Sequence, residues 1–290
     1  MDLSVVIVSY NVRDYLEQSL RSAIHASANL ECEIIVVDNN SADGSCGMVE
    51  KTFPGVILIR NIKNTGFSAA NNQAIRIARG KYILLLNPDT IVEDNTFTKC
   101  IGFMNSHPLA GAVGVRMTDG KGRYLPESKR SFPTPSSAFF KTSGISRLFP
   151  RSKWFSRYYL AHIDSMKTAE IEVLAGAFMF IRAEALSKTG LLDEDFFMYG
   201  EDIDLSIRLI KAGYKNYYLP ETTIVHYKGM STQRKGYTDI HHFYRAMRIY
   251  IRKRAEEGDF RYLKYILISG TYVRQALAVV ARFVKIMFFA

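Results

Sequence analysis

The sequence predicts an α/β fold in which a mostly parallel sheet is flanked by helices. Two observations lead to this prediction. Apolar runs rich in β-branched residues alternate with helical patterns through the first half of the chain, which is typical of βαβ units. Three strand ends also finish in small, polar or acidic residues, and in an open parallel sheet ligands bind outside the carboxyl ends of the strands.

The expected elements follow from the spacing of the apolar residues. Strands are predicted at residues 3–9, 33–37, 56–59, 82–86 and 110–115, with helical patterns at about 15–24 and 69–78 between them. Regular patterning returns with an apolar run at residues 171–181, a helix at 201–212 that ends before Gly213, and a strand at 214–219. A long helix is predicted from residue 261 onward.

The chain divides into a large N-terminal part and a C-terminal appendage. A length of 290 residues suits one large domain with such an addition. We expect a domain at residues 1–227 and a basic helical segment at 228–290. Within the domain, residues 119–167 carry four prolines without clear periodicity, which is typical of a functional loop region.

The positive charge is concentrated at the C-terminal end. The net charge is +10, and residues 228–290 hold 13 of the 38 Lys and Arg residues but only 4 of the 28 acidic ones. This asymmetry indicates that one end of the molecule meets an anionic surface. Three scattered cysteines without a CxxC pair predict neither disulfides nor a zinc site, and no basic leader precedes the first strand, so we expect a cytoplasmic protein.

Polar residues close the first two predicted strands. Ser9, Tyr10 and Asn11 follow the first, and Asp38 opens an Asp-Asn-Asn-Ser run after the second. These side chains could bind a base and a ribose, with Asp38 accepting from a pyrimidine imide N–H. A single cluster of this kind is more often a helix cap or a turn. Their recurrence at successive strand ends favours a nucleotide site.

A glycine turn opens the helix that follows the third strand. The segment from Asn64 to Asn72 reads Asn-Thr-Gly-Phe-Ser-Ala-Ala-Asn-Asn, and its small residues allow close approach to a helix N-terminus, which favours phosphate. The segment is neither a GxGxxG motif nor a Walker loop, so dinucleotide and ATP binding are disfavoured.

Asp89 is presented on a proline turn after a buried strand, in Asn87-Pro88-Asp89-Thr90. A metal that clamps a diphosphate needs such a carboxylate, and His226 is a candidate second ligand. The pair would leave positions for diphosphate oxygens and water, as a substrate-linked Mg²⁺ or Mn²⁺ requires. The alternatives are an ordinary turn in which Asp89 caps a helix beginning near Glu93, and a structural histidine.

The richest acidic cluster, Glu201-Asp202-Ile203-Asp204, begins a predicted helix. Acidic residues in a first turn compensate the helix dipole, which is one sufficient reason for their presence. Crowded carboxylates also repel one another, which raises the pKa of at least one and suits a general base. The dipole acts in the opposite direction, so the sequence leaves the sign of the shift open.

Together these segments resemble glycosyltransferase family 2, the inverting nucleotide-sugar enzymes with the GT-A fold. The resemblance runs in family order from the first residues to about His226, through VVIVSYN, VVDNNSADGS, NTGFSAANN, YILLLNPDT and GEDIDLSIRLIKAGY. The NPDT and GEDID forms are most similar to a rhamnosyltransferase-like branch that builds bacterial surface polysaccharides. The implied fold is a Rossmann-like mixed sheet with flanking helices, followed here by C-terminal amphipathic helices.

The resemblance also implies roles for the matched residues. Asp202 would be the catalytic base with Glu201 beside it, Asp89 would end the metal-binding DxD motif, and His226 would be a further metal ligand. Asn87 replaces the first Asp of that motif, so metal affinity would be low without a bound diphosphate. The residues that would bind the donor are Ser9, Tyr10, Asn11, Asp38, Asn64, Asn71, Asn87 and Asp89.

The implied reaction moves a sugar from a nucleoside-diphosphate sugar, with dTDP-rhamnose as one candidate, to a hydroxyl of a lipid-linked glycan. A divalent cation, Mg²⁺ or Mn²⁺, would be the cofactor. One alternative is a nucleotidyltransferase, which normally shows a glycine-rich basic loop near the N-terminus. Another is a catalytically silent carbohydrate-binding or assembly protein.

Residues 261–290 combine a narrow polar stripe with a broad apolar surface. Spanning a bilayer would place Arg274 near its middle, which is costly, so we expect the segment to lie on the anionic inner face of the cell membrane. The alternative is packing on the protein itself or on a homodimer partner. Nucleic acid is disfavoured because the apolar face is too broad. The stripe comprises Lys264, Thr271, Arg274, Gln275, Arg282 and Lys285.

Overall fold

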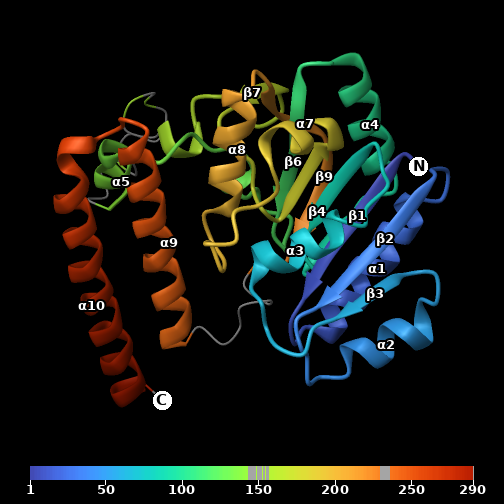
Figure 1. Ribbon diagram of the computed structural model, residues 1–290, viewed down its shortest axis with the longest axis horizontal. Coiled ribbons are helices and arrows are strands. Elements are labelled where there is room, and N and C mark those ends of the chain that lie inside the picture. Colours follow the sequence, from blue (N-terminus) through green and yellow to red (C-terminus); the bar gives the residue numbers. More distant parts are fainter. Residues whose placement is uncertain (143–147, 149–151, 153, 155–156, 229–235, 290) are drawn as a thin grey trace.

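A nine-stranded mixed β-sheet forms the centre of the structure, with helices on both faces and two long helices beyond one end (Figure 1). The computed structural model describes residues 1–142, 148, 152, 154, 157–228 and 236–289. Within these residues the strand order is β3-β2-β1-β4-β8-β6-β9-β5, and β7 also pairs with β9.

The N-terminal half forms the parallel part of the sheet. Strands β3, β2, β1 and β4 run in the same direction, as the alternation of strands and helices predicts. All seven residues of β1 and all five of β4 are buried, so both strands lie inside the core. The elements are β1 (Leu3–Ser9), α1 (Arg13–Ala26), β2 (Cys32–Asp38), α2 (Ser45–Thr52), β3 (Ile57–Arg60), α3 (Phe67–Ile75) and β4 (Tyr82–Leu86).

The second half makes the sheet mixed. Strand β8 lies antiparallel between β4 and β6, and β5 and β7 run antiparallel to β9, so the expected parallel arrangement holds for only part of the sheet. The strand predicted at residues 214–219 continues to residue 226, because a register shift accommodates Pro220. The elements are β5 (Thr90–Val92), α4 (Thr96–Ser106), β6 (Ala110–Thr118), β7 (Ala169–Ile171), β8 (Phe178–Arg182), α7 (Ala183–Thr189), α8 (Glu201–Lys211) and β9 (Lys215–His226).

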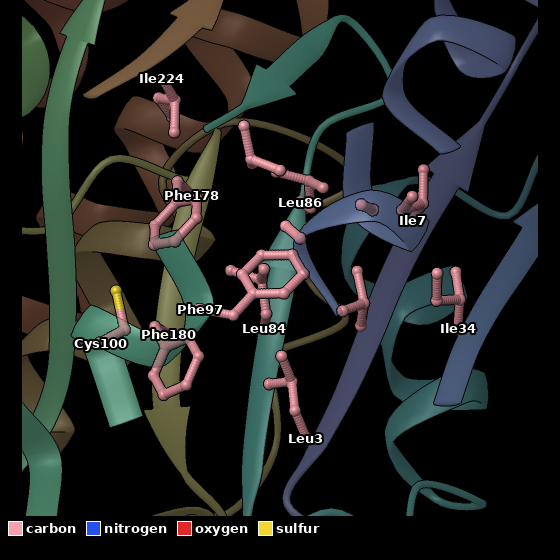
Figure 2. Packing of buried hydrophobic residues seen from close by; sticks show 14 of the residues in the cluster. Leu3, Ile7, Ile34, Leu84, Leu86, Phe97, Cys100, Phe178, Phe180 and Ile224 are labelled. Atoms are coloured by element: carbon pink, nitrogen blue, oxygen red, sulfur yellow. The ribbon is translucent and has the colours of Figure 1, made fainter. Parts of the chain in front are cut away.

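Two hydrophobic clusters cover the two faces of the sheet. Alternate residues of β1 enter opposite clusters, which explains why the buried strands read as continuous apolar runs. Helices α1, α2 and α4 supply residues to one cluster, and α3, α7 and α8 supply residues to the other. Figure 2 shows the first cluster, where Phe97 of α4 packs beside Leu84 of β4.

The proline-containing region is largely irregular, as predicted. It holds η1 (Pro126–Ser128), α5 (Pro135–Thr142) and η2 (Arg157–Tyr159), while part of residues 143–156 lies outside the described chain. Lys129 is buried, and its ammonium donates to the carbonyls of Leu160 and Ile163 at 2.6 and 2.7 Å. This lysine therefore joins the two ends of the region in addition to the backbone hydrogen bond from the N–H of Ser131 to the carbonyl of Tyr158 at 2.9 Å.

A helical hairpin follows the sheet. It comprises α9 (Tyr237–Glu256), η3 (Arg261–Leu263) and α10 (Lys264–Phe289). Lys253 of α9 donates to Asp193 at 2.6 Å and to Asp204 of α8 at 2.5 Å, which fastens α9 to the domain. Helix α10 packs beside α9, where Arg248 donates to Gln275 at 2.8 Å (Figure 1).

The polar stripe of α10 is turned partly inward. Thr271 is buried and Gln275 faces α9, so these two residues of the stripe that was expected to meet lipid headgroups contact protein instead, while Arg274 is exposed. Residues 261–284 are long and apolar enough to cross a membrane by length and composition alone, and 6% of the most apolar stretch is buried. Large apolar side chains remain exposed along the helix, among them Tyr265, Ile266, Val273, Leu277, Val280 and Phe283.

Gly80 occupies a position where no side chain fits. Its N–H donates to the hydroxyl of Ser4 at 2.8 Å, and that hydroxyl donates to the buried carboxylate of Glu33 at 2.6 Å. A Cβ at residue 80 would lie 2.5 Å from the backbone nitrogen of Ser4 and 2.6 Å from the carbonyl oxygen of Tyr82. Both contacts are with backbone of the central strands, which cannot move away independently.

We therefore expect Gly80→Ala to lower the free energy of unfolding by at least about 2 kcal/mol through overpacking. Gly102→Ala is the matched control, because nothing lies within 4 Å of a Cβ at that position in α4. In a helix interior this exchange should stabilise by about 0.5–1 kcal/mol. Urea unfolding of both variants tests the difference, and equal midpoints for the two would contradict it.

Candidate functional site

The polar ends of three parallel strands meet at one edge of the sheet. Ser9 pairs in register with Asp38, and β4 ends at Leu86, opposite Ile7. The Asn87–Asp89 turn therefore emerges beside the ends of β1 and β2. In sheets of this kind the carboxyl edge is where ligands bind.

Asn11 joins the loops that follow β1 and β2, and Asp38 closes the second of them. Asp38 Oδ2 accepts from the N–H of Ser41 at 2.8 Å, and Asn11 Oδ1 accepts from the N–H of Ala42 at 2.8 Å. Asp38 is 2% exposed, and neither its Oδ1 nor the hydroxyl of Ser9 has a hydrogen bond within the described residues. Tyr10 is exposed. The strand ends therefore combine buried acceptor atoms with an accessible aromatic ring.

The Cys46 thiol lies near Asp38 and remains neutral. Burial in the first place, and then the neighbouring Asp38, raise the pKa of Cys46 to about 11. At neutral pH Cys46 therefore adds no negative charge beside Asp38.

The buried side chain of Asn39 holds the loop before α3 in place through hydrogen bonds. Its Oδ1 accepts from Asn61 at 2.9 Å and from the hydroxyl of Thr65 at 3.1 Å, while its amide donates to the carbonyl of Gly66 at 3.1 Å. Because Asn39 is buried and makes these contacts, its side chain shapes the loop instead of facing a ligand.

The two asparagines expected near the donor make local hydrogen bonds. Asn64 Oδ1 accepts from the N–H of Gly66 at 2.9 Å, and the Asn71 amide donates to the carbonyl of Phe67 at 2.8 Å. These bonds set the glycine turn and the first turn of α3. Direct contact of Asn64 or Asn71 with a donor stays a prediction.

Gly66 connects this side of the site with the segment before α8. Its φ is +88°, and a Cβ there would lie 2.5 Å from the carbonyl oxygen of Phe197. The same carbonyl accepts from the N–H of Phe67 at 2.6 Å. A glycine is therefore required both by the backbone conformation and by the close approach.

Asp89 and His226 are brought together by strand pairing. Thr90 of β5 pairs with His226 of β9, and His226 Nε2 lies 3.4 Å from Asp89 Oδ1. Asp89 is 1% and His226 9% exposed, and His226 Nδ1 has no hydrogen bond within the described residues. The alternative in which Asp89 caps a helix near Glu93 is wrong, because β5 follows the turn and α4 begins at Thr96.

This pair fits a divalent cation that is held largely by its substrate. Within the described parts of the chain, no group of three or more His, Cys, Asp or Glu side chains gathers in a way that could hold a metal. One carboxylate and one imidazole remain, with His226 Nε2 beside Asp89 Oδ1, and most oxygen ligands would have to come from a diphosphate and water. Mg²⁺ and Mn²⁺ accept this kind of coordination.

The acidic pair enters α8 through a sharp turn. Tyr199 and Gly200 have φ values of +68° and +91°, after which Glu201 and Asp202 occupy the first turn of the helix. Asp202 Oδ2 accepts from the N–H of Gly176 at 3.2 Å and from the guanidinium of Arg130. Asp202 Oδ1 accepts from the N–H of Ile203 at 2.8 Å.

The sequence left open whether the pKa of a carboxyl group in this acidic cluster is raised or lowered, and the surroundings of Glu201 answer that question. Its side chain is buried and its Oε2 has no hydrogen bond within the described residues. Burial is the main cause that raises the pKa of Glu201 well above its usual range, and the adjacent Asp202 adds to it. The helix dipole is outweighed for this residue. Glu201 therefore holds a proton at neutral pH.

Arg130 is the residue that sequence reasoning missed. It lies in the irregular region, where no periodicity or motif distinguishes it from neighbouring basic residues. Burial is the largest single influence and opposes its charge, but Asp202 and Tyr158 together outweigh burial and raise the pKa of the guanidinium. The ion pair is therefore maintained inside the protein.

Residues 176 and 177 join the two halves of the site. The carbonyl of Ala177 accepts from the N–H of Asn87 at 3.0 Å, while the N–H of Gly176 donates to Asp202. A side chain at Gly176 would contact both acids, because its Cβ would lie 3.6 Å from Asp202 Oδ2 and 3.7 Å from Glu201 Oε1. The turn that carries Asp89 and the helix that carries Asp202 thus flank the same two residues.

Comparison with known proteins identifies the family. The family model described as Glycosyl transferase family 2 matches residues 4–190, which is more than half of the chain. A second model, described as Glycosyltransferase (GlcNAc), matches residues 120–267 and so includes Arg130, α8 and β9.

Two relatives are named rhamnosyltransferases. The chain is 25% identical to the N-acetylglucosaminyl-diphospho-decaprenol L-rhamnosyltransferase of Mycobacterium tuberculosis, over 96% of this chain and 92% of that protein. It is 27% identical to rhamnosyltransferase WbbL of Escherichia coli, over 77% of this chain and 82% of that protein. The expected rhamnosyltransferase-like branch is thereby confirmed.

Solved structures confirm the fold. Staphylococcus aureus TarS in complex with UDP-GlcNAc has a TM-score of 0.59 at 18% identity, with 94% of this chain and 72% of that chain covered. The mannosyltransferase PcManGT of Pyrobaculum calidifontis in complex with GDP-Man and Mn²⁺ has a TM-score of 0.59 at 18% identity, covering 99% and 76%. The expected GT-A fold agrees with both, and the matched family model shows that the chain belongs to glycosyl transferase family 2.

Proposed function

We propose that this protein transfers a sugar, with inversion, from a nucleoside-diphosphate sugar to a hydroxyl of a lipid-linked glycan during surface polysaccharide synthesis. The observation that carries the proposal is the arrangement of Asp38, Asp89 and Asp202 around the carboxyl edge of the sheet and residues 176 and 177. This arrangement offers a nucleoside acceptor, a metal ligand and a base in one site.

The donor is proposed to carry a pyrimidine base. Buried Asp38 has an acceptor oxygen without a hydrogen bond in the described chain, which suits the imide N–H of thymine or uracil. The rhamnosyltransferase names of the two relatives favour dTDP-rhamnose as the donor. Ser9, Tyr10 and Asn11 would line the nucleoside pocket, with Asn64, Asn71 and Asn87 nearer the phosphates.

Asp89 and His226 are proposed to hold a divalent cation together with the donor diphosphate. When bound, Mg²⁺ or Mn²⁺ would neutralise the negative charge that develops on the departing nucleoside diphosphate. The buried pair holds its two donor atoms close together, so little reorganisation is needed when the substrate arrives.

Asp202 is proposed to act as the base. It would take the proton of the acceptor hydroxyl as that oxygen bonds to the anomeric carbon and the bond from this carbon to the diphosphate oxygen breaks. One displacement from the opposite face inverts the anomeric configuration. Glu201, which is neutral by virtue of its burial, would line the site without competing for the proton.

The acceptor is proposed to reach the site from a membrane. One relative is named for a lipid-diphosphate acceptor, and α10 here exposes a row of large apolar side chains. Residues 1–227 would form the catalytic domain, residues 119–167 its acceptor side, and residues 228–290 a hairpin that rests on the cytoplasmic face of the membrane. A homodimer through α10 is the alternative that a membrane assay must exclude.

Asp202→Asn should reduce transfer by at least about 1,000-fold while donor binding survives, because the amide keeps the shape but accepts no proton. Product formation from a panel of nucleotide sugars and calorimetric titration with dTDP provide the two readouts. Asp195→Asn, in the exposed loop before α8, is the control and should leave both unchanged. An active Asp202→Asn protein would remove Asp202 from the role of base.

Mn²⁺ should raise the melting temperature strongly only when dTDP is also present, because the protein itself supplies two ligands. His226→Asn should diminish this joint stabilisation, while His25→Asn on the exposed surface of α1 should not. Thermal unfolding with and without EDTA measures both effects. Equal Mn²⁺ stabilisation of the two variants would show that His226 is not a ligand.

Vesicles that contain phosphatidylglycerol should carry the protein upward in a flotation gradient. Changing Leu277 and Phe283 of α10 together to glutamate should leave the protein in the bottom fraction, because two charges replace exposed apolar contacts. Ile62→Glu, which is 94% exposed on the domain, is the control and should float normally. Flotation of the double variant at the level of the unchanged protein would reject membrane binding through α10.

A further inference from the structure

Arg130 and Asp202 form an ion pair that is almost entirely removed from solvent. Each side chain is 12% exposed. The Arg130 guanidinium donates both to Asp202 Oδ2 and to the carbonyl of Leu174, so one nitrogen group bridges the base to the chain before β8. The Arg130 backbone is fixed as well, because its carbonyl accepts from the N–H of Val173 at 3.0 Å.

The hydrogen bonds distinguish the two oxygens of Asp202. Oδ2 accepts from Arg130 and from the N–H of Gly176, while Oδ1 accepts one hydrogen bond, from the N–H of Ile203. A carboxylate oxygen can accept two hydrogen bonds. Oδ2 is therefore saturated by protein donors, and Oδ1 retains a position for an incoming hydroxyl.

We propose that Arg130 is the positioning residue of the transfer: it holds Asp202 through Oδ2 and so makes Oδ1 the atom that receives the acceptor proton. The inference rests on the proposed function and goes one step further, since it assigns a role to a residue from the acceptor-side region. No other described cation lies in an ion pair with Asp202.

Arg130 also distinguishes the two neighbouring acids. The charged and titratable groups around them are Arg130 from the region before α5, Tyr158 of η2 beside Arg130, and Tyr199 beside Glu201. Two buried carboxylates side by side do not both ionise readily. The cation is bonded to Asp202 and not to Glu201, and burial together with the neighbouring Asp202 raises the pKa of Glu201, so Glu201 is the acid that holds the proton.

The charge balance of the transfer follows from this arrangement. The acceptor oxygen bonds to the anomeric carbon, the bond to the diphosphate breaks, and the hydroxyl proton moves to Oδ1, which leaves Asp202 neutral beside Arg130. The cation then favours return of the proton to solvent, which restores the ionised base. The gain from Arg130 is fixed orientation and a defined charge, not greater basicity.

The position of Arg130 is secured from both sides. Neighbouring Lys129 is buried against the carbonyls of Leu160 and Ile163, and the carbonyl of Pro133 accepts from the hydroxyl of Tyr250 in α9 at 3.0 Å. The proposed membrane hairpin and the base are thus connected through a short piece of chain.

The test compares Arg130→Met, Arg130→Lys and a control, Arg21→Met. Arg21 of α1 also pairs with an acid, Glu17, at 2.7 Å, but its side chain is 60% exposed and belongs to no part of the proposed site. Arg130→Met should slow transfer by about 100-fold with the dissociation constant for dTDP changed less than about 2-fold, because positioning and not donor contact is lost. Arg130→Lys should recover part of the rate, and Arg21→Met should match the unchanged protein.

The pH profile separates positioning from a merely structural role. Arg130 opposes the raised pKa of Glu201, so removal of the cation should raise that pKa further. The base loses its partner cation in the same variant, so the acid limb of the transfer rate, which reports protonation of the base, should move to higher pH. Arg130→Lys keeps the positive charge, so the acid limb of its pH profile should stay at the same pH as in the unchanged protein. A ¹³C-carboxyl NMR titration of Glu201, identified by Glu201→Gln, reports the same shift without turnover.

An Arg130→Met protein with the original rate and titration would overturn the proposal. A slower variant whose melting temperature falls while the acid limb and the Glu201 titration stay in place would also overturn it. If the methionine variant does not fold, an unimpaired rate in Arg130→Lys is the contradicting result. If the unchanged protein transferred no sugar from any nucleotide sugar tried, the proposed function would be refuted instead. The NMR titration would still test whether Arg130 controls the pKa of Glu201.

Discussion

Parallel pairing of β1 with β2 and β4 is the constraint on which the site depends. The register places Ser9 against Asp38 and brings the Asn87–Asp89 turn out beside them. Burial of these strands on both faces fixes the register, because a slip by one residue would exchange the two sets of core side chains. The polar groups at the strand ends are thus positioned by hydrophobic packing several residues away.

The second half of the site is attached to that edge by backbone hydrogen bonds. Gly176 and Ala177 bond to Asp202 and to Asn87, so the helix that carries Asp202, the proposed base, is held against the turn that carries Asp89. A Cβ at residue 176 would lie at ordinary van der Waals distance from both acids, so this part of the chain packs directly against them. Buried carboxylates are costly without partners, and the Arg130 cation supplies a partner for Asp202.

The C-terminal hairpin is joined to α8 by an ion pair. Lys253 of α9 bonds to Asp204 of α8, one turn beyond the start of the helix that carries Asp202. Tyr250 reaches the chain near Arg130. Helix α10 turns Thr271 and Gln275 towards α9, which leaves its apolar residues outward. A surface bound by α10 would therefore have a defined orientation relative to the base.

The sequence by itself determined the parallel strands, the polar residues at their ends, the helix that begins with Glu201 and Asp202, and the family. Each of these depends on the local spacing of apolar residues or on a short motif. Tertiary structure decided the rest. The antiparallel direction of β8 and the continuation of β9 beyond Pro220 depend on pairing between segments that are distant in the sequence. Arg130 became part of the site only when the irregular region folded against α8, and the neutral state of Glu201 follows from burial, which no local pattern encodes.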